Sequence, residues 1–221
     1  MKKEKPKSSA VYHVYNRGVE KRIIFLDDDD RFRFIHDLYE FNDSNPAFKY
    51  FGSSTSENKG RDVLVEILAF CMMPNHYHLM LRQVSENGIT EFMRKIGTGY
   101  TNYFNKKYER VGSLFQGRYK MMLMKNEGRY INLPQYIHLN PLKIVTPGIK
   151  ENGTKNFKKA LNFLRNYRWS SYRDYIGIKN FPSLLNKKFM SEIYGSPKDY
   201  QKSILARIKQ FGSSTSENEK W

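Results

Sequence analysis

Two apolar, strand-like runs of the sequence are separated by only two residues, and this arrangement restricts the fold more than any other feature. The first run, residues 61–73, reads RDVLVEILAFCMM, and the second, residues 76–84, reads HYHLMLRQV. The proline and asparagine between them are turn formers. Two strands joined so closely must run antiparallel in one sheet. The chain is therefore predicted to build an antiparallel sheet around this hairpin.

Other segments supply further strands. The run AVYHVYN, residues 10–16, alternates and is rich in β-forming residues, so it predicts a strand that ends at the NRG turn. The run YKMMLMK, residues 119–125, predicts a short strand after a loop. Strands and helices then follow in mixed order, which is typical of an α+β sandwich with helices packed against the sheet.

Three helices are predicted from apolar residues at helical spacing. The first follows the acidic residues 27–30, since negative charge is favourable at a helix start. The second spans about 88–107. The third spans about 127–140 and is expected to stop at Asn140, because a residue before proline avoids the α region. The apolar stripes of the first two are Phe32, Ile35, Leu38 and Tyr39, then Ile89, Phe92, Met93, Ile96, Tyr100, Tyr103 and Phe104.

The remainder of the chain is lysine-rich and only loosely patterned, so a basic, mainly helical C-terminal extension is predicted over 151–221. The octapeptide FGSSTSEN occurs at 51–58 and again at 211–218. Both copies have the composition of a loop or tail. Nothing in the sequence explains the repetition.

The composition indicates a polyanionic partner. Lys plus Arg number 38 and Asp plus Glu number 22, which gives a formal net charge of +16. Nucleic acid is the first candidate for such a charge, although compositional drift also produces basic proteins. No apolar run approaches the ~20 residues of a membrane helix. The single cysteine fits a reducing compartment, so we expect a soluble cytoplasmic protein.

A pair of histidines stands at the start of the second strand of the hairpin. His76 and His78 project to one face of a strand, about 6.6 Å apart along it, while Tyr77 faces the other way. Two imidazoles at this spacing can close on one metal ion. The alternative is two unrelated histidines that form hydrogen bonds in the core, and a bare His-x-His does not decide between them.

A second group of polar residues lies on the third predicted helix. Tyr136 and Asn140 are four residues apart and therefore share a helix face. The phenol is a candidate nucleophile and the amide oxygen a candidate third metal ligand. His138 points elsewhere on the helix, and His13 and His36 have no nearby partners, so these three are expected to be structural.

Several ordered motifs together resemble a known family. They are YHVYNRGVEKRIIF, LAFCMMPNHYHLML, YTNYFNKKYERVGSLFQGRYK and YIHLNPLKIV, in that order over roughly residues 10–150. The later WSSYRDYIG is similar to longer members. The chain resembles the HUH single-tyrosine transposases of bacterial insertion sequences, in the branch related to the transposases associated with repetitive extragenic palindromes (REP).

This resemblance implies a fold, an activity and a site. The fold would be the ferredoxin-like HUH endonuclease domain, spanning 1–150. The activity would be cleavage and rejoining of single-stranded, hairpin-bearing DNA through a covalent 5′-phosphotyrosine. His76, His78 and Asn140 match the metal ligands, with Mg²⁺ or Mn²⁺ as the ion, and Tyr136 matches the nucleophile. The family contains monomers and dimers, so a homodimer remains open.

The chain departs from the family pattern at two positions. Tyr77 is bulkier than the usual aliphatic residue between the histidines. Pro134, two residues before the tyrosine, removes a helix hydrogen bond and is expected to kink the helix. If the kink turned Tyr136 away from the histidines, the expected activity would be lost.

Basic residues on and after the second predicted helix are the candidate DNA contacts, with interleaved aromatics available for base stacking. The set is Arg94, Lys95, Lys106, Lys107, Arg118 and Lys120. For each one, a solvated surface charge is the competing interpretation. At the level of the whole protein, two alternatives stand beside the transposase. One is a domesticated relative that nicks palindromic DNA, and the other is a non-catalytic DNA-binding protein.

Overall fold

The sheet at the centre of the molecule has four strands within the described residues, 9–45 and 61–212, of this computed structural model. The strand order is β2-β3-β1-β4, and all neighbouring strands are antiparallel. The bounds are β1 Val11–Arg17, β2 Val65–Met73, β3 His76–Gln83 and β4 Lys120–Leu123. One helix joins β1 to β2 and another joins β3 to β4, which is the ferredoxin-like order. The predicted α+β architecture is confirmed.

The predicted hairpin is formed by β2 and β3, with Met73 paired to His76 across the two-residue turn. Besides the pairing of the two strands, backbone hydrogen bonds from another segment hold this turn in place. The carbonyl of Pro74 accepts from the backbone N–H groups of Ile24 and Phe25, and the carbonyl of Asn75 accepts from Gly18. The hairpin tip is thus bonded to the chain that follows β1.

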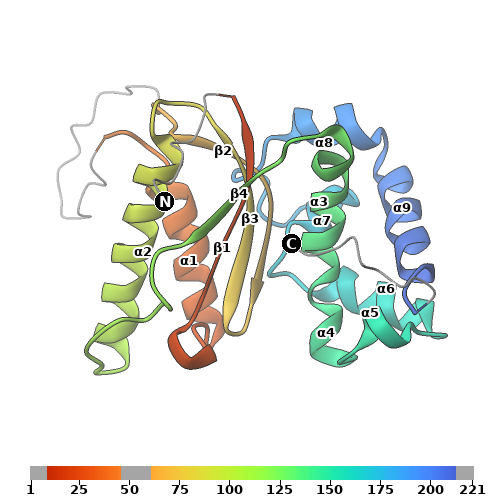
Figure 1. Cartoon of the computed structure of the whole chain (residues 1–221), viewed down its shortest axis with the longest axis horizontal. Coiled ribbons are helices and arrows are strands. Elements are labelled where there is room, and N and C mark those ends of the chain that lie inside the picture. The colour runs from red at the N-terminus through yellow and green to blue at the C-terminus, as the bar shows by residue number, and fades with distance from the viewer. Residues whose placement is uncertain (1–8, 46–60, 213–221) are drawn as a thin grey trace.

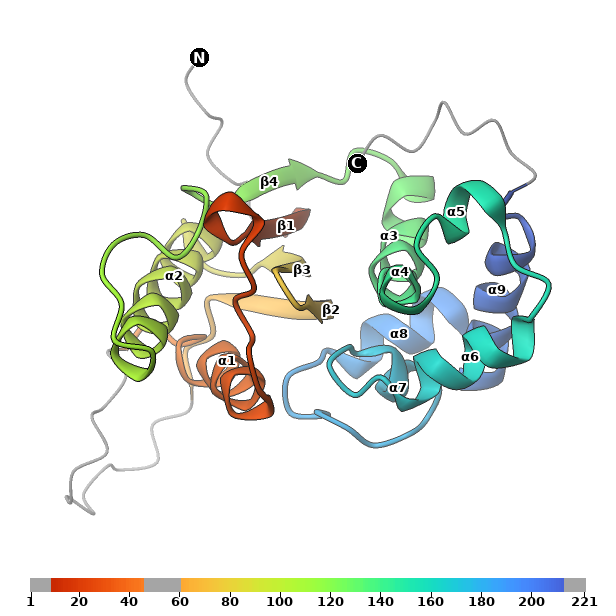
Figure 2. The same ribbon diagram turned by 90° about the horizontal axis from the view of Figure 1, so that it is seen from below.

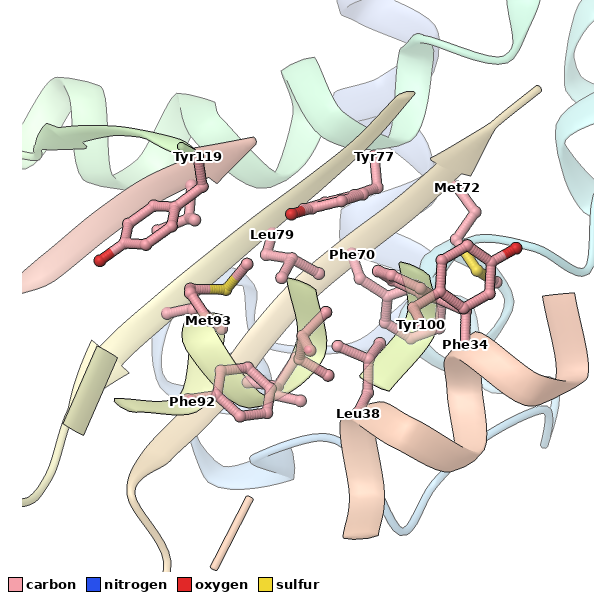
Figure 3. Close-up of a cluster of buried hydrophobic side chains, with 14 of the residues drawn as sticks. Phe34, Leu38, Phe70, Met72, Tyr77, Leu79, Phe92, Met93, Tyr100 and Tyr119 are labelled. Carbon is pink, nitrogen blue, oxygen red and sulfur yellow. The ribbon is translucent and has the colours of Figure 1, made fainter. Parts of the chain in front are cut away.

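Two helices cover one face of the sheet (Figure 1). They are α1, Asp28–Glu40, and α2, Gly88–Lys107, and they pack against each other. The acidic start of α1 forms a capping box, in which Asp27 accepts from the N–H of Asp30 and Asp30 accepts from that of Asp27. Burying the apolar stripes of both helices against β2 and β3 builds the first core (Figure 3).

The predicted stripe of α1 was wrong at two positions. Phe32 and Tyr39 are exposed, while Phe34, with Ile35 and Leu38, enters the core. Phe32 instead lies edge-on to Trp169, at 5.2 Å between ring centroids, outside the main core. In α2 the predicted span is confirmed, and every stripe residue except the half-buried Tyr103 is buried.

The remaining helices cover the opposite face (Figure 2). The first of them, α3, packs on β2 and β3 and, together with α6 to α9, builds a second core. The bounds of these elements and of a short 3₁₀ turn are η1 Val19–Lys21, α3 Glu127–Leu139, α4 Leu142–Val145, α5 Ile149–Asn152, α6 Phe157–Asn166, α7 Tyr172–Tyr175, α8 Lys187–Tyr194 and α9 Pro197–Lys209. The division at residue 150 stays a prediction.

The segment WSSY, residues 169–172, covers the outer edge of β2. Met72 donates its backbone N–H to the carbonyl of Trp169, and Ser171 donates to that of Phe70. His138 of α3 contacts both the hydroxyl of Ser171, at 2.6 Å, and that of Tyr200, at 2.5 Å. His138 is therefore structural, as predicted, and this part of the β2 edge of the sheet is covered.

The first FGSSTSEN copy lies outside the described residues, as does all but the first two residues of the second. Among the helices that the structure describes, none has the length and apolar character required to cross a membrane.

Candidate active site

The alternation of β3 separates the histidines from the tyrosine between them, as predicted. Tyr77 is buried in the first core, 5.0 Å from the ring of Phe34 and 5.9 Å from that of Phe115 (Figure 3). His76 and His78 face the other way, toward the helices of the second core, with their ring centroids 5.0 Å apart. The large ring of Tyr77 thus packs in the first core and does not reach the sheet face that carries His76 and His78.

A third histidine joins this pair, and here the prediction from sequence was wrong. His13 of β1 was expected to have no nearby partner, but its Nε2 lies 2.9 Å from Nδ1 of His78. Both rings are buried, and they stack at 5.1 Å. Burial lowers the pKa of His13 and of His76 to about 4 and that of His78 well below its usual value, with nearby positive charge contributing for His76 and His78. All three imidazoles are therefore neutral at neutral pH.

Tyr136 lies over these rings. Its ring centroid is 5.7 Å from those of both His13 and His78, with edge-on geometry. Pro134 lies inside α3, yet the helix continues from Glu127 to Leu139. The hydroxyl of Tyr194 donates to the carbonyl of Ile131, three residues before the proline. The helix is thus supported beside the proline, and the tyrosine faces the histidines.

Asn140 follows one turn later as the C-cap of α3, so the helix ends where predicted. Its backbone is nevertheless in the α region (φ −55°, ψ −39°) although it precedes proline, and α4 begins two residues later. Its side-chain Nδ2 donates to the carbonyl of Tyr136 at 2.9 Å. Its Oδ1 is buried and accepts no hydrogen bond from any residue that the structure describes. A buried carbonyl oxygen without a donor is costly, and a cation would satisfy it.

The chemistry of these donors fits a divalent ion. Nδ1 of His76 lies 2.6 Å from Oδ1 of Asn75, and Nδ1 of His78 is engaged by His13, so each ring has its Nε2 left. Two imidazole nitrogens and the Asn140 oxygen form a mixed, weakly ligating set with open positions. Across residues 9–45 and 61–212, no three His, Cys, Asp or Glu side chains gather closely enough to hold a metal ion. The candidate set therefore depends on the amide.

Residues 49–140, which include the hairpin, α2 and Tyr136, match the family model described as "Transposase IS200 like". This part of the chain is therefore similar to the IS200-like transposases. Among solved structures, the chain is similar to the REP-associated tyrosine transposase bound to a REP hairpin. The identity is 14%, the TM-score is 0.51, and the match covers 84% of this chain and 92% of that one. This likeness establishes the HUH fold. No curated protein matches the sequence.

Basic side chains from outside the matched region also lie around the candidate site, and the sequence analysis did not identify them. Nζ of Lys150, from α5, lies 4.4 Å from the ring centroid of Tyr136. Burial, followed by the charges of Lys143 and Arg207, lowers the pKa of Lys150 to about 8. Lys143 and Arg17 are close enough to His76 to depress its pKa. The site is therefore electropositive, which suits an anionic substrate.

The predicted DNA-binding residues lie apart from one another. Lys120 pairs with Tyr15 across β1 and β4, so it shares the histidine face of the sheet. Lys107 forms ion pairs with Asp27 and Asp30, at 2.7 and 2.9 Å, and Lys95 pairs with Glu91. These two lysines are already partly neutralised. Lys106 is exposed at the end of α2.

Arg94 and Arg118 both line a cavity of about 420 Å³ between α2 and the loop before β4. Tyr77 and Phe115 form part of its wall, which places the cavity on the sheet face opposite the histidines. A Cβ built on Gly97 would meet nothing within 4 Å. The cavity therefore combines two arginines, aromatic rings and open space, which are the features of a nucleotide subsite.

Proposed function

We propose that this protein is a single-tyrosine transposase that cleaves and rejoins single-stranded, hairpin-bearing DNA, with Tyr136 as the nucleophile. The observation that carries the proposal is the position of Tyr136, edge-on to His78 and one turn before a buried amide oxygen that lacks a donor. A tyrosine buried only as core would not need such polar neighbours. The IS200-like domain and the HUH fold support the same assignment.

In the proposed reaction, the phenolic oxygen of Tyr136 attacks the scissile phosphorus. The bond between phosphorus and the 3′ oxygen breaks, which leaves a 5′-phosphotyrosine and a free 3′ hydroxyl. The phenol loses its proton to solvent and the 3′ oxygen gains one. Because one phosphodiester replaces another, the reverse attack by a 3′ hydroxyl rejoins DNA without ATP. Burial raises the pKa of Tyr136, and the Asn140 side chain opposes that rise.

His76, His78 and Asn140 are the residues that would hold Mg²⁺ or Mn²⁺. When bound, such an ion supplies Lewis-acid polarisation of the scissile phosphate and offsets its negative charge. The chain's own cations contribute in the same direction. We assign Lys150, with Lys143 and Arg17, to binding of that phosphate, because they surround the tyrosine and the histidines.

The DNA outside the reacting phosphate is assigned to basic residues on both faces. Arg94 and Arg118 would hold a nucleotide in the cavity beside α2, and Lys106 and Lys120 would contact backbone phosphates. Lys95 and Lys107 would contribute less to DNA binding, because carboxylates already pair with their ammonium groups. A hairpin is proposed as the partner because the structurally similar transposase is bound to one.

The domain limits proposed for this activity are 1–150 for the catalytic part and 151–221 for the basic extension. The extension also contributes packing to α3, the helix of the nucleophile. Its removal is therefore expected to disturb the site.

Covalent trapping on a single-stranded oligonucleotide tests the proposal. The protein is incubated with hairpin-bearing DNA and Mg²⁺ or Mn²⁺, and the adduct is resolved on a denaturing gel. Tyr136→Phe should abolish the adduct while leaving folding and DNA binding in place. Tyr100→Phe and Tyr103→Phe are matched controls, because these hydroxyls bond to Ile24 and Asp30 on the other face.

Mass spectrometry of the trapped species then locates the modified residue. A nucleotide on another tyrosine would refute the site, and cleavage without an adduct would refute the mechanism. Tight binding with no cleavage under any metal would identify a non-catalytic DNA-binding protein.

A further inference from the structure

His13 reaches the site from β1, in a different part of the sequence from the other histidines. In the sheet register Tyr15 is opposite His78 and His13 is opposite Met80, so His13 is the diagonal neighbour of His78 on the same face. It is almost fully buried and stacks on His78 with an interplanar angle of 24°. The ring cannot reorient freely within this packing.

The contact between Nε2 of His13 and Nδ1 of His78 fixes how protons are shared. Both rings are buried, and a neutral imidazole carries one N–H and one bare nitrogen. A 2.9 Å contact between two ring nitrogens therefore requires one to donate and the other to accept. Two arrangements satisfy this contact, and they differ in which nitrogen of His78 is left bare.

The neighbouring ligand shows which arrangement suits a metal site. Asn75 donates through Nδ2 to the carbonyl of Lys21, so its Oδ1 faces Nδ1 of His76. An amide oxygen only accepts, so His76 carries its proton on Nδ1 and leaves Nε2 bare. For His78 to present the same atom, its Nδ1 must donate to His13. His13 then accepts at Nε2 and carries its own proton on Nδ1.

We propose that His13 is a positioning residue that holds His78 in the Nδ1–H tautomer and so presents Nε2 of His78 to the divalent ion. This inference rests on the proposed function. It assigns to His13 the part that outer partners of metal-binding histidines commonly have, namely fixing the tautomer and ring orientation. In this role His13 acts through His78 and is not itself a ligand of the ion.

Two variants separate this role from simple packing. His13→Gln keeps an acceptor, because the glutamine Oε1 extends about as far as the histidine Nε2. His13→Leu keeps apolar bulk and removes the acceptor. Mn²⁺ affinity is measured on the full chain without DNA, by calorimetry and by the electron paramagnetic resonance signal of free Mn²⁺. His13→Leu should bind about 10–100-fold more weakly, and His13→Gln within a few fold of the wild type.

The nitrogen-15 spectrum of the ring nitrogens is a readout independent of any variant. In the metal-free wild type, His76 and His78 should both carry the proton on Nδ1. A wild-type His78 protonated on Nε2 would overturn the proposal, as would wild-type Mn²⁺ affinity in His13→Leu or equal losses in the two variants. If His13→Leu does not fold, the wild-type spectrum and His13→Gln decide. If the wild type binds no Mn²⁺, the proposed function fails, and the spectrum alone decides for or against His13.

Discussion

The two faces of the central sheet differ in the side chains that they receive from the same strand, β3. From β3, Tyr77, Leu79 and Leu81 enter a core of aromatic and aliphatic side chains under α1 and α2. The alternate residues His76 and His78 face Tyr136 and a half-buried lysine under α3. One face thus stabilises the fold through apolar packing, whereas the other buries polar groups. Alternation along a single strand lets a rigid core and a polar site lie one residue apart.

The largest expected effect is a salt dependence that differs between the faces. If about 6–10 phosphates are neutralised, DNA affinity should fall by about 10³–10⁵-fold from 50 to 200 mM salt. Each lost phosphate contact reduces the logarithmic slope by about 0.9. Lys143→Met, near the histidines, should reduce the slope by this amount. Lys107→Met should change it little, because Asp27 and Asp30 already pair with that ammonium. A flat salt dependence would contradict DNA binding itself.

Neighbouring substitutions in β3 should separate stability from activity. Tyr77→Ala removes a fully buried ring from the first core and should lower the free energy of unfolding by about 3–5 kcal/mol. His78→Ala removes a hydrogen bond and should cost about 1–2 kcal/mol, while the metal-dependent adduct disappears. Urea denaturation and the trapping gel measure the two quantities. Similar losses of stability in both variants would mean that His78 is a core histidine.

Much of this difference between the faces could be predicted from the sequence, because it follows from local periodicity. The hairpin, the span of α2 and the opposite orientations of Tyr77 and His78 all follow from repeats of 2 or 3.6 residues. The stripe of α1 was less well predicted, because a periodic pattern does not say whether Phe32 or Phe34 meets the core. In that helix, tertiary packing decided which aromatic residue was buried.

The residues of the site that were not predicted from the sequence are brought there by long-range contacts, which a local sequence pattern does not reveal. His13 and His78 are 65 positions apart, and their contact depends on the register of β1 against β3. Lys150 lies in a four-residue helix that has no periodic signal, and only the fold brings it to Tyr136. At Pro134 local preference did not show how the helix is supported, since the helix continues through the proline beside the contact of Tyr194 with Ile131. The end of α3 at Asn140, by contrast, was predicted from the proline that follows it.

A pH effect should arise on the face of the sheet that α1 and α2 cover. Burial raises the pKa of Asp37 in α1 to about 7, although Arg33 lies 2.9 Å away and opposes the rise. Because this folded-state pKa exceeds the ordinary value of 3.8, the contribution to stability is present below pH 3.8 and is lost as pH rises through 7. From pH 5 to 7 the wild type should lose about 2 kcal/mol relative to Asp37→Asn. Denaturation at several pH values measures this difference in unfolding free energy. A difference that stays constant from pH 5 to 7 would contradict the raised pKa of Asp37.

The smallest expected effect tests whether the α2 face is only a core or also binds DNA. Gly97→Leu should place a side chain in the cavity lined by Arg94 and Arg118 without a backbone clash, since a Cβ there meets nothing within 4 Å. Replacing a mid-helix glycine should raise stability by about 0.5–1 kcal/mol. Losing one stacked nucleotide should nevertheless lower hairpin affinity roughly tenfold. Stability and affinity should therefore change in opposite directions.

Asn102→Leu is the matched control, because Asn102 is exposed on the same helix but does not line the cavity. It should leave the affinity unchanged. In Gly97→Leu, adduct formation on DNA at saturating concentration should also persist, because Tyr136 lies on the other side of the sheet. Unchanged affinity in Gly97→Leu would make the cavity a packing feature only. Loss of the adduct at saturation would mean that the two faces are coupled. A substitution on the α2 face would then have altered the reaction of Tyr136 on the opposite face.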